Sequence, residues 1–384
     1  IPVSMAIDTW AVDYVLLDEK DQILGDTYGY RDHRTDGMDA EVAKILPETE
    51  LYGKTGIQKQ IFNTVYQLMA VKQQTQEFLQ QTLLMLPDYF GFRLTGNKLS
   101  EYTNGSTTQL VNPDTFQWDK ELIRKLGYPE DIFLPLQMPG TKVGQLLPEI
   151  QKEVGFDLEV VLCGSHDTAS AVMAVPQTEG DGIYISSGTW SLMGIESLKP
   201  VITEDAAAAN FTNEGGYNHR FRFLKNIMGL WMIQSVRHEY NDAYSFAQLC
   251  DMAEESKEFP SRVDVNDQSF LSPDSMVEAI RQYCHKTGQP VPESVGELTS
   301  VVYRSLAQSY GETVRGLEKI AGKTYDSIHI IGGGSNAAYL NQLTADATGK
   351  TVYAGPGEAT AIGNLLAQMI HAGDLADLKS ARKC

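Results

Sequence analysis

The sequence is poor in cysteine, in long apolar runs and in positive charge, and each shortage excludes a class of protein. Its cysteines are Cys163, Cys250, Cys284 and Cys384. They stand far apart without a CxxC pair, so neither a disulfide framework nor a structural zinc site is expected. No apolar run reaches the ~18 residues of a membrane-spanning helix. Lys and Arg number 31 against 50 Asp and Glu, a formal net charge of −19, which disfavours nucleic acid or an anionic membrane surface as the main partner.

Several catalytic motifs are also missing. The chain has no G-x-x-x-x-G-K-[ST] loop, no H-x-x-x-H or H-x-x-E-H pair and no G-x-S-x-G elbow, which excludes a P-loop NTPase, a protein-built metal site and an α/β-hydrolase. Residues 1–10 lack the basic segment of a secretory signal. We therefore expect a cytoplasmic protein. Such a protein can still contain a phosphate-binding site, because backbone N–H groups can form one.

The length of 384 residues predicts two or three domains, at about 150 residues each. A stretch rich in turn-forming residues, 176–182, separates two blocks that each contain strands and helices. We place one domain at residues 1–175 and a second at 176–384.

Apolar patterns predict the elements of the first block. Residues 3–7 and 14–17 are typical of strands, and the apolar run 158–162 indicates a buried strand followed by a helix from Thr168 to Val175. A helical spacing is also expected around Phe78, Leu84 and Met85, and an interruption at Pro87 and Asp88.

The second block opens with a β-hairpin over residues 183–195. Further on, a strand at 328–331 leads through three glycines into a helix carrying Leu340 and Leu343, and a strand at 351–354 precedes a helix at 359–370. This alternation predicts an α/β fold with some parallel sheet.

Asp167 follows the buried strand and starts the helix after it. Carboxylates at such strand ends face the ligand crevice of α/β sheets, so Asp167 is a candidate general base. The alternative is an N-cap for the helix. Ser165, His166 and Asp167 are adjacent and cannot converge as a catalytic triad.

Two glycine- and serine-rich turns are candidate phosphate or nucleotide contacts. Ser186, Ser187, Gly188 and Thr189 form the hairpin tip, where small residues expose backbone N–H groups, although an ordinary turn has the same composition. The turn at residues 332–334 could admit phosphates or adenosine at a helix N-terminus. A dinucleotide fingerprint would need an acidic residue at the end of the next strand. That strand ends without one, so an NAD-dependent oxidoreductase is disfavoured.

Asn226 is a further candidate. Its amide can donate and accept toward sugar hydroxyls, or it can cap the helix that carries Leu230, Ile233 and Val236.

In combination these segments resemble the FGGY family of carbohydrate kinases. The matching runs include residues 7–10, 30–32, 62–64, 101–104, 165–171, 186–194, 213–216, 225–231 and 332–334, then Asn341, Gln342, Leu343, Ala345, Asp346, Glu358, Ala359, Gly363 and Asn364. They extend over nearly the whole chain.

The resemblance implies two ribonuclease-H-like (actin-like ATPase) domains with a cleft between them and a sugar kinase activity. Asp167 would be the general base that deprotonates the C1 hydroxyl of a ketose, and the γ-phosphoryl group of MgATP would transfer in line. The expected substrate is L-rhamnulose, with L-fuculose or D-xylulose as alternatives. ATP and Mg²⁺ are the implied cofactors.

The resemblance also assigns binding residues. Ala11, His166, Thr168 and Asn226 would hold the sugar, and Thr189, Gln234, Gly332, Gly333 and Gly334 would hold ATP. The family often has glycine where this chain has Ala11.

One family motif is missing. The phosphate-binding hairpin D-x-G-x-x-S-x-R, which begins the family's N-terminal domain, is not found in the sequence. We therefore expect an N-terminal domain truncated before residue 1 and a C-terminal domain shortened at its end. A non-catalytic sugar- or nucleotide-binding remnant is the alternative function.

Overall fold

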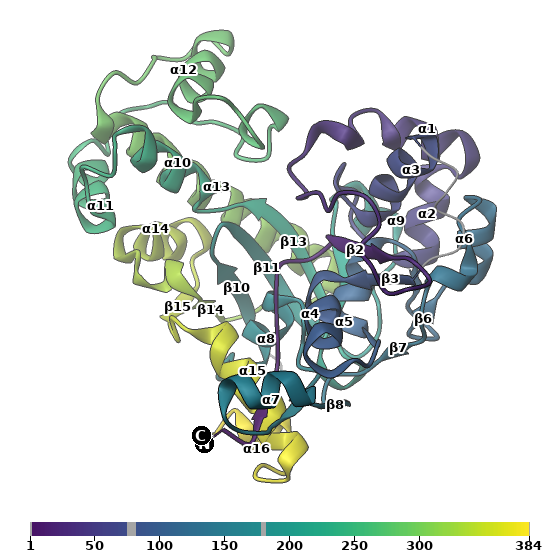
Figure 1. Ribbon diagram of the computed structural model, residues 1–384. Helices are drawn as coiled ribbons and strands as arrows, with labels where there is room; N and C mark the ends of the chain where they lie inside the picture. Colours follow the sequence, from purple (N-terminus) through teal and green to yellow (C-terminus); the bar gives the residue numbers. More distant parts are fainter. Residues whose placement is uncertain (1, 75–81, 178–181, 384) are drawn as a thin grey trace. The chain divides into compact units, whose positions relative to one another are not determined.

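The structure, a computed structural model, describes residues 2–74, 82–177 and 182–383 (Figure 1). The chain divides into two compact units, neither of which is continuous in sequence. The first comprises Ile1–Thr178, Glu196–Phe223 and Thr360–Cys384, and the second comprises Glu179–Ile195 and Leu224–Ala359. Residues 178–181 of the predicted linker lie outside the described residues.

The first unit is built from many short elements. Its strands are β1 (Ser4–Met5), β2 (Tyr14–Leu17), β3 (Thr82–Met85), β4 (Ser100–Glu101), β5 (Val111–Asn112), β6 (Gln117–Trp118), β7 (Leu136–Gln137), β8 (Lys142–Gln145), β9 (Glu159–Val161) and β12 (Thr212–Gly215). Its helices are α1 (Met38–Ile45), α2 (Glu48–Thr55), α3 (Thr64–Gln74), α4 (Leu86–Thr95), α5 (Tyr102–Gly105), α6 (Lys120–Lys125), α7 (Pro148–Val154), α8 (Asp167–Met173), α9 (Glu204–Ala208), α15 (Ala359–Ala372, from Thr360 on) and α16 (Leu378–Ala381). Short 3-10 helices are η1 (His33–Thr35), η3 (Ser106–Thr108), η4 (Glu130–Ile132) and η5 (Tyr217–His219).

A three-stranded sheet of order β1-β9-β8 carries the start of the candidate site. β1 pairs with β9 in parallel, with Ser4 opposite Glu159, and β8 pairs with β9 antiparallel. The strands predicted at residues 3–7, 14–17 and 158–162 and the helix predicted from Thr168 are confirmed, with some shorter bounds.

The helical spacing predicted around Leu84 and Met85 is wrong; Phe78 lies outside the described residues. Leu84 and Met85 belong to strand β3, which pairs antiparallel with β2 in the register Tyr14 to Met85. Pro87 does not interrupt a helix but stands in the first turn of α4, where the missing N–H of proline costs no hydrogen bond. Pairing with a distant strand decided the conformation of this apolar run.

A large core of the first unit packs β2, α3 and β3 against the segment from α5 to β7. Its fully buried members include Val65, Leu83, Tyr102, Leu122 and Ile132. A smaller core joins α8 to α15 and α16 through Cys163, Met173, Leu366 and Leu378. Cys163 is fully buried, as expected for a structural thiol.

The second unit is formed by longer elements. Its strands are β10 (Ile183–Ser187), β11 (Trp190–Ser197), β13 (Phe221–Met228), β14 (Ser327–Ile331) and β15 (Thr351–Ala354), where β11 and β13 each cross the division between the units. Its helices are α10 (Trp231–Glu239), α11 (Phe246–Glu255), α12 (Met276–Lys286), α13 (Val295–Ala321) and α14 (Ala338–Thr348), with 3-10 helices η6 (Gln268–Phe270) and η7 (Gly333–Asn336).

A six-stranded sheet runs in the order β12-β13-β11-β10-β14-β15. β10 and β11 form the predicted antiparallel hairpin, while β14 pairs in parallel with both β10 and β15. The predicted strand-turn-helix order at β14 and α14 is confirmed. The parallel strands bring the turns that follow β10 and β14 to the same edge of the sheet.

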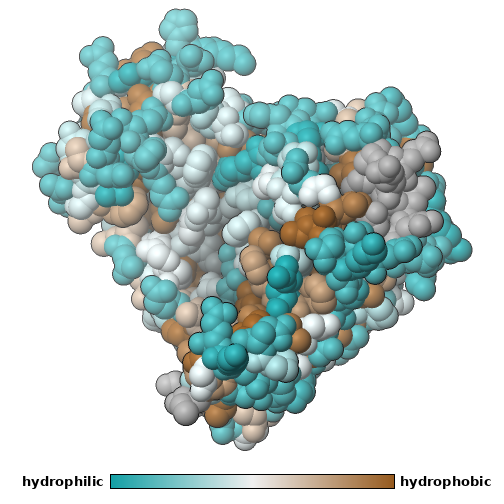
Figure 2. Space-filling view, viewed as in Figure 1, coloured by the Kyte–Doolittle hydropathy of each residue, from teal (hydrophilic) through white to brown (hydrophobic). Residues whose placement is uncertain are grey.

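Helix α13 organises the second unit. A capping box between Ser294 and Glu297 starts it, and Gly322 in the left-handed conformation ends it. It packs against α11 and α14, with Leu298, Val302 and Leu306 among its fully buried residues. The surface over α11 and α12 is mostly hydrophilic (Figure 2). None of the helices that the structure describes has the length and apolar character to cross a membrane.

Candidate active site

Asp167 lies at the turn between β9 and α8, beside the chain segment that follows β1. The backbone N–H of Thr9 donates to Ser165 O at 2.9 Å, and that of Asp167 donates to Thr9 O at 2.8 Å. His166 is the N-cap residue of α8 and Asp167 is its first helical residue, so the N-cap interpretation of Asp167 is wrong. Its side chain is 46% exposed, which leaves the carboxylate accessible to a ligand.

The Asp167 carboxylate has polar neighbours in its own segment and at Asp8. Thr168 Oγ1 donates to Asp167 Oδ1 at 3.2 Å, and His166 Nε2 lies 3.5 Å from the same oxygen. Burial raises the pKa of Asp8. The hydrogen bond from Asn364 lowers this pKa, and the negative charge of Asp167 raises it. Sequence reasoning named Asp167 and missed Asp8 as its neighbouring carboxyl.

A buried carboxylate, Glu101, supports the turn before Asp167. It accepts hydrogen bonds from Ser165 N at 3.2 Å and Ser165 Oγ at 2.5 Å, and from the backbone N–H groups of Thr103 and Asn104 at 2.7 and 3.0 Å. Both carboxylate oxygens of Asp88 accept from Glu101 N. Burial raises the pKa of Glu101, and burial followed by the charge of Glu101 holds the pKa of Asp88 well above its usual range. Two buried acids therefore fix the backbone that carries His166.

A second buried pair, Glu214 and Arg222, lies against His166. Arg222 Nη2 is 3.0 Å from His166 Nδ1, and Arg222 Nη1 is 3.2 Å from Glu214 Oε2. Neither residue was assigned a role from the sequence. An arginine between Phe221 and Phe223 in a strand pattern was the available signal, because a charged residue in an apolar strand needs a buried partner.

Ala11 stands in a tight turn beside an exposed aromatic ring. Its carbonyl accepts from Asp13 N at 2.9 Å, and Val12 has a left-handed φ of 67°. The Trp10 indole is 49% exposed and its Nε1 donates to Asp13 Oδ2 at 2.7 Å. This arrangement can present a ring face to a sugar.

In the second unit, the hairpin tip contacts the start of α10. Leu230 N donates to Gly188 O at 3.0 Å and Trp231 N donates to Thr189 O at 3.1 Å. A Cβ on Gly229 would lie 2.5 Å from the carbonyl carbon of Trp190, so only glycine permits this close approach. Thr189 is thereby fixed by backbone contacts, which leaves its hydroxyl to other partners.

The three glycines of the turn after β14 differ in their surroundings. Gly332 has a φ of +82° and lies close to Ser187 O, and a Cβ on Gly334 would lie 1.9 Å from Ser187 Oγ. Gly333 has open space around it. The turn therefore packs onto the end of β10 through Gly332 and Gly334, while Gly333 faces outward.

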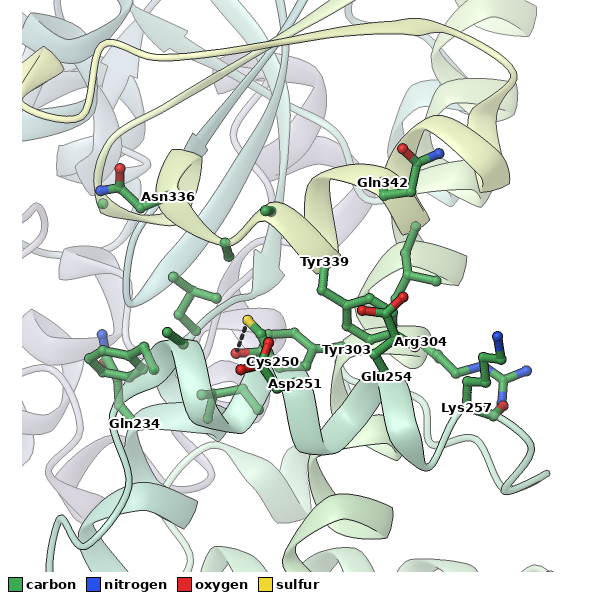
Figure 3. A pocket seen from close by; sticks show the side chains of 18 of the residues that line it. Gln234, Cys250, Asp251, Glu254, Lys257, Tyr303, Arg304, Asn336, Tyr339 and Gln342 are labelled. Atoms are coloured by element: carbon green, nitrogen blue, oxygen red, sulfur yellow. Dashed lines mark hydrogen bonds between the residues drawn. The ribbon is translucent and has the colours of Figure 1, made fainter.

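A pocket of about 1030 Å³ opens at this turn (Figure 3). It brings together Gly333 and Gln234, two of the residues predicted to hold ATP, with Gly188 beside them. Its other lining residues are Leu230, Ile233, Phe246, Ala247, Cys250, Asp251, Glu254, Lys257, Glu258, Tyr303, Arg304, Asn336, Ala337, Ala338, Tyr339, Gln342, Leu343 and Asp346. Nothing in the sequence linked α11 and α13 to this pocket.

The pocket combines aromatic and apolar walls with a polar rim. Figure 3 shows Tyr303 and Tyr339 projecting between α11 and the start of α14, and Cys250 Sγ donates to Tyr303 Oη at 3.4 Å. Lys257 and Arg304 lie at one end (Figure 3). Such a cavity has the size and composition of a site for a small organic ligand.

Asn226 lies within β13 and is half-buried. The helix that follows has Leu230 at its N-cap, so Asn226 does not cap it. Among residues 2–74, 82–177 and 182–383, no group of three or more His, Cys, Asp or Glu side chains could hold a metal ion.

Two family models match the chain. The N-terminal domain model of the FGGY family of carbohydrate kinases matches residues 2–174, and its C-terminal domain model matches residues 183–372. Rhamnulokinase from Halalkalibacterium halodurans is 53% identical over 384 residues, which is 100% of this chain and 82% of the relative. Rhamnulokinase from Bacillus subtilis is 46% identical over 385 residues, covering 99% of this chain and 78% of the relative.

The expected truncation of the two domains stays a prediction, and the chain spans 82% of the length of the first relative and 78% of the second. Both domain models are matched, the first from residue 2, and the relatives align along the chain from end to end. Strand β1 lies at the edge of its three-stranded sheet, where it pairs with β9.

Solved structures share the fold at low sequence identity. A ligand-bound xylulose kinase from Lactobacillus acidophilus superposes with a TM-score of 0.78 at 17% identity, over 99% of this chain and 78% of that one. Glycerol kinase with ADP from Plasmodium falciparum gives 0.76 at 14%, over 100% and 78%. These structures confirm the predicted two-domain kinase fold, and the two family models exclude the oxidoreductase alternative. The chain belongs to the FGGY family of carbohydrate kinases.

Proposed function

We propose that the protein transfers the γ-phosphoryl group of ATP to the C1 hydroxyl of L-rhamnulose, giving L-rhamnulose 1-phosphate and ADP in L-rhamnose catabolism. The observation that carries the proposal is an identity of 53 to 45% along essentially the whole chain with relatives named rhamnulokinase. The half-exposed carboxylate of Asp167 supports it, because phosphoryl transfer to an alcohol needs a base at the attacking oxygen.

In this mechanism Asp167 takes the proton of the C1 hydroxyl. The resulting oxygen forms a bond to the γ-phosphorus as the bond from that phosphorus to the β-bridging oxygen breaks, and ADP leaves with the electron pair. The contacts from His166 and Thr168 to Asp167 Oδ1 orient the carboxylate. Catalysis then rests on positioning and on stabilisation of charge.

The sugar is proposed to lie against His166 and Thr168, with the turn at Ala11 beside them and Asn226 contributing its amide. Alanine at position 11 adds one methyl group where the family often has glycine. That methyl group would narrow the pocket beside the sugar and favour one ketose over another.

ATP is proposed to bind the pocket at Gly333, with Gln234 near the nucleoside and the backbone around Gly332 and Gly334 against it. The aromatic and apolar walls suit adenine, and the Thr189 hydroxyl would meet a phosphate. Magnesium would arrive as part of the MgATP substrate, since Mg²⁺ is commonly held by phosphates and few protein ligands.

The two domains of the family are proposed to bind different substrates. Residues 1–175 are proposed to form the sugar-binding domain and residues 176–384 the nucleotide-binding domain, in a protein of the cytoplasm without a nucleic-acid or membrane partner. The net charge of −19 and the scattered cysteines support this location.

A substrate panel tests the proposal. The chain is incubated with MgATP and, separately, L-rhamnulose, L-fuculose, D-xylulose and glycerol, and ADP release is followed. Phosphorus NMR of the product identifies the phosphorylated carbon. Preference for L-rhamnulose with phosphate on C1 is the expected result, and preference for another ketose contradicts the proposed substrate but not the kinase activity.

The competing function is a binding module without turnover. It predicts heat of binding for ADP or a ketose in calorimetry but no ADP release with any sugar. Turnover above the rate of an Asp167→Asn variant excludes it.

A further inference from the structure

The Arg222 guanidinium decides which nitrogen of His166 can carry a proton. Arg222 Nη2 lies 3.0 Å from His166 Nδ1, within the range of a hydrogen bond. A guanidinium has only donors and stays charged. If Nδ1 also carried a hydrogen, two N–H groups would face each other at this distance.

The carboxylate of Glu214 offers Nδ1 a weaker alternative. Its Oε2 is 3.4 Å from Nδ1, farther than the 3.0 Å between Nδ1 and Arg222 Nη2. The same oxygen lies 3.2 Å from Arg222 Nη1. Glu214 is therefore the counter-charge of Arg222, and Nδ1 is the acceptor of the arginine.

The burial of the three side chains makes this assignment rigid. Arg222 is fully buried, and the side chains of Glu214 and His166 are 6% and 8% exposed. Arg222 Nε is further anchored by donating to Gly215 O at 2.8 Å. His166 N donates to Thr103 Oγ1 at 3.3 Å. His166 is thus held both at its backbone N–H and at the Nδ1 atom of its ring.

We propose that Arg222 is a positioning residue that holds His166 as the neutral Nε2–H tautomer, so that the ring presents a donor and no acceptor on the side of Asp167. The partner of one imidazole nitrogen sets the protonation of the other. Nε2 lies 3.5 Å from Asp167 Oδ1, and its N–H can donate to a substrate oxygen brought to Asp167. The identification of this oxygen as a ketose oxygen rests on the proposed function. The assignment of the tautomer is independent of that function.

Nitrogen NMR tests the tautomer without any turnover. The full chain is labelled with ¹⁵N-histidine, and two-bond ¹H–¹⁵N correlations are recorded at pH 8, with His166 assigned from a His166→Asn variant. The expected pattern for His166 has an unprotonated Nδ1 and a protonated Nε2. A protonated Nδ1 overturns the proposal.

The decisive variant removes both buried charges together. Arg222→Met alone leaves Glu214 unpaired and can prevent folding, so Arg222→Met is combined with Glu214→Met, which keeps the side-chain volumes similar. Arg220→Met is the matched control two residues away. In the double variant the two His166 nitrogen signals are expected to move toward each other as both tautomers become populated, while in the control they stay in place. An unchanged Nε2–H pattern in the double variant overturns the proposal.

Kinetics then separate positioning from structure. The double variant is expected to raise KM for the ketose roughly tenfold, the scale of one lost hydrogen bond, with KM for ATP unchanged. An unchanged KM for the ketose contradicts the positioning role. A chain with the expected tautomer but no turnover of any ketose leaves the tautomer assigned and refutes the proposed function.

Discussion

The turn that carries Asp167 and the turn that carries Gly333 are held in opposite ways. The first depends on buried side chains: Glu101 binds the backbone of Ser165, and Arg222 binds the His166 ring. The second depends on glycines, because Gly332 and Gly334 have no side chain and pack directly onto Ser187. Charged and polar side chains therefore hold the turn of Asp167, whereas close packing holds the turn of Gly333.

The difference follows from what each turn is proposed to handle. A general base needs a carboxylate of controlled orientation, and buried hydrogen bonds supply that control at the cost of desolvating charged groups. A nucleotide needs backbone close to its phosphates and a wall for its base, which small residues provide. Removing charge should therefore damage the first turn, and adding a methyl group should damage the second.

The largest effect is expected from Asp167→Asn. Without a proton acceptor at C1, kcat should fall by ~10³-fold, while the fold is unaffected because the side chain is half-exposed. Coupled measurement of ADP release gives kcat, and calorimetry gives ketose and ATP affinity. Asp114→Asn, at an exposed position, should leave kcat unchanged. More than half of wild-type kcat in Asp167→Asn would remove Asp167 as the base.

Glu101→Gln should be the next most damaging change. The amide keeps one acceptor oxygen and turns the other into a donor, which faces the N–H groups that Glu101 now binds. We expect the free energy of unfolding to drop by about 2 to 3 kcal/mol, the range for hydrogen bonds to a charged group. Urea denaturation measures it, with exposed Glu153→Gln as control, expected within about 0.5 kcal/mol of wild type. A loss equal to that of the control would mean that Glu101 does not support the turn.

Gly334→Ala tests the steric half of the comparison. Its Cβ would lie 1.9 Å from Ser187 Oγ, so the turn must shift, at a cost of roughly 1 to 3 kcal/mol of stability together with weaker ATP binding. Gly333→Ala is the matched control, because its Cβ meets nothing within 4 Å. Ser187→Gly combined with Gly334→Ala should restore stability. Equal losses in the two alanine variants would show that Ser187 packing is not the cause.

The smallest effect is the pH dependence of Asp88. Burial raises the pKa of Asp88 in the folded chain, so the folded chain binds this proton more tightly than the unfolded chain. Its contribution to stability is full below the ordinary pKa of 3.8 and declines as pH rises through the raised value. Asp88→Asn has no such titration and keeps an acceptor for Glu101 N.

The Asp88→Asn variant should therefore gain stability relative to wild type in the pH range above 3.8, as the raised pKa of Asp88 is passed, by about 1 kcal/mol. Urea denaturation at several pH values across that window measures the difference. Asp114→Asn should track the wild type at every pH. A constant difference between Asp88→Asn and wild type would show that Asp88 does not titrate in this window.

Sequence patterns predicted the elements next to both turns well. The run 158–162, the hairpin at 183–195 and the glycine turn before Leu340 are local signals, because strand burial, tight turns and helix starts depend on neighbouring residues. The run at Leu84 and Met85 was assigned wrongly, because a short apolar stretch fits helix and strand alike. Its pairing with β2, about 70 residues away in the chain, decided it.

Candidate residues divide in the same way. Asp167 and Gly333 were named because each stands at a turn that a motif identifies, and Gln234, within α10, was named from the family resemblance. Arg222 and Glu214 were assigned no role, since their role exists only where the strands β12 and β13 meet His166, 56 residues before Arg222. The walls of the nucleotide pocket, from α11 and α13, carry no motif at all.

The sequence by itself determined the family, the order of strands and turns, and the carboxylate and glycines at those turns, because these depend on residues close together in the chain. The tertiary structure alone decided which charged side chains are buried beside them. A buried polar group is stable only with a partner, and the partner of His166, like that of Asp8 at Asn364, comes from a distant segment. Folding brings those segments together, and their contact cannot be predicted from a local sequence pattern.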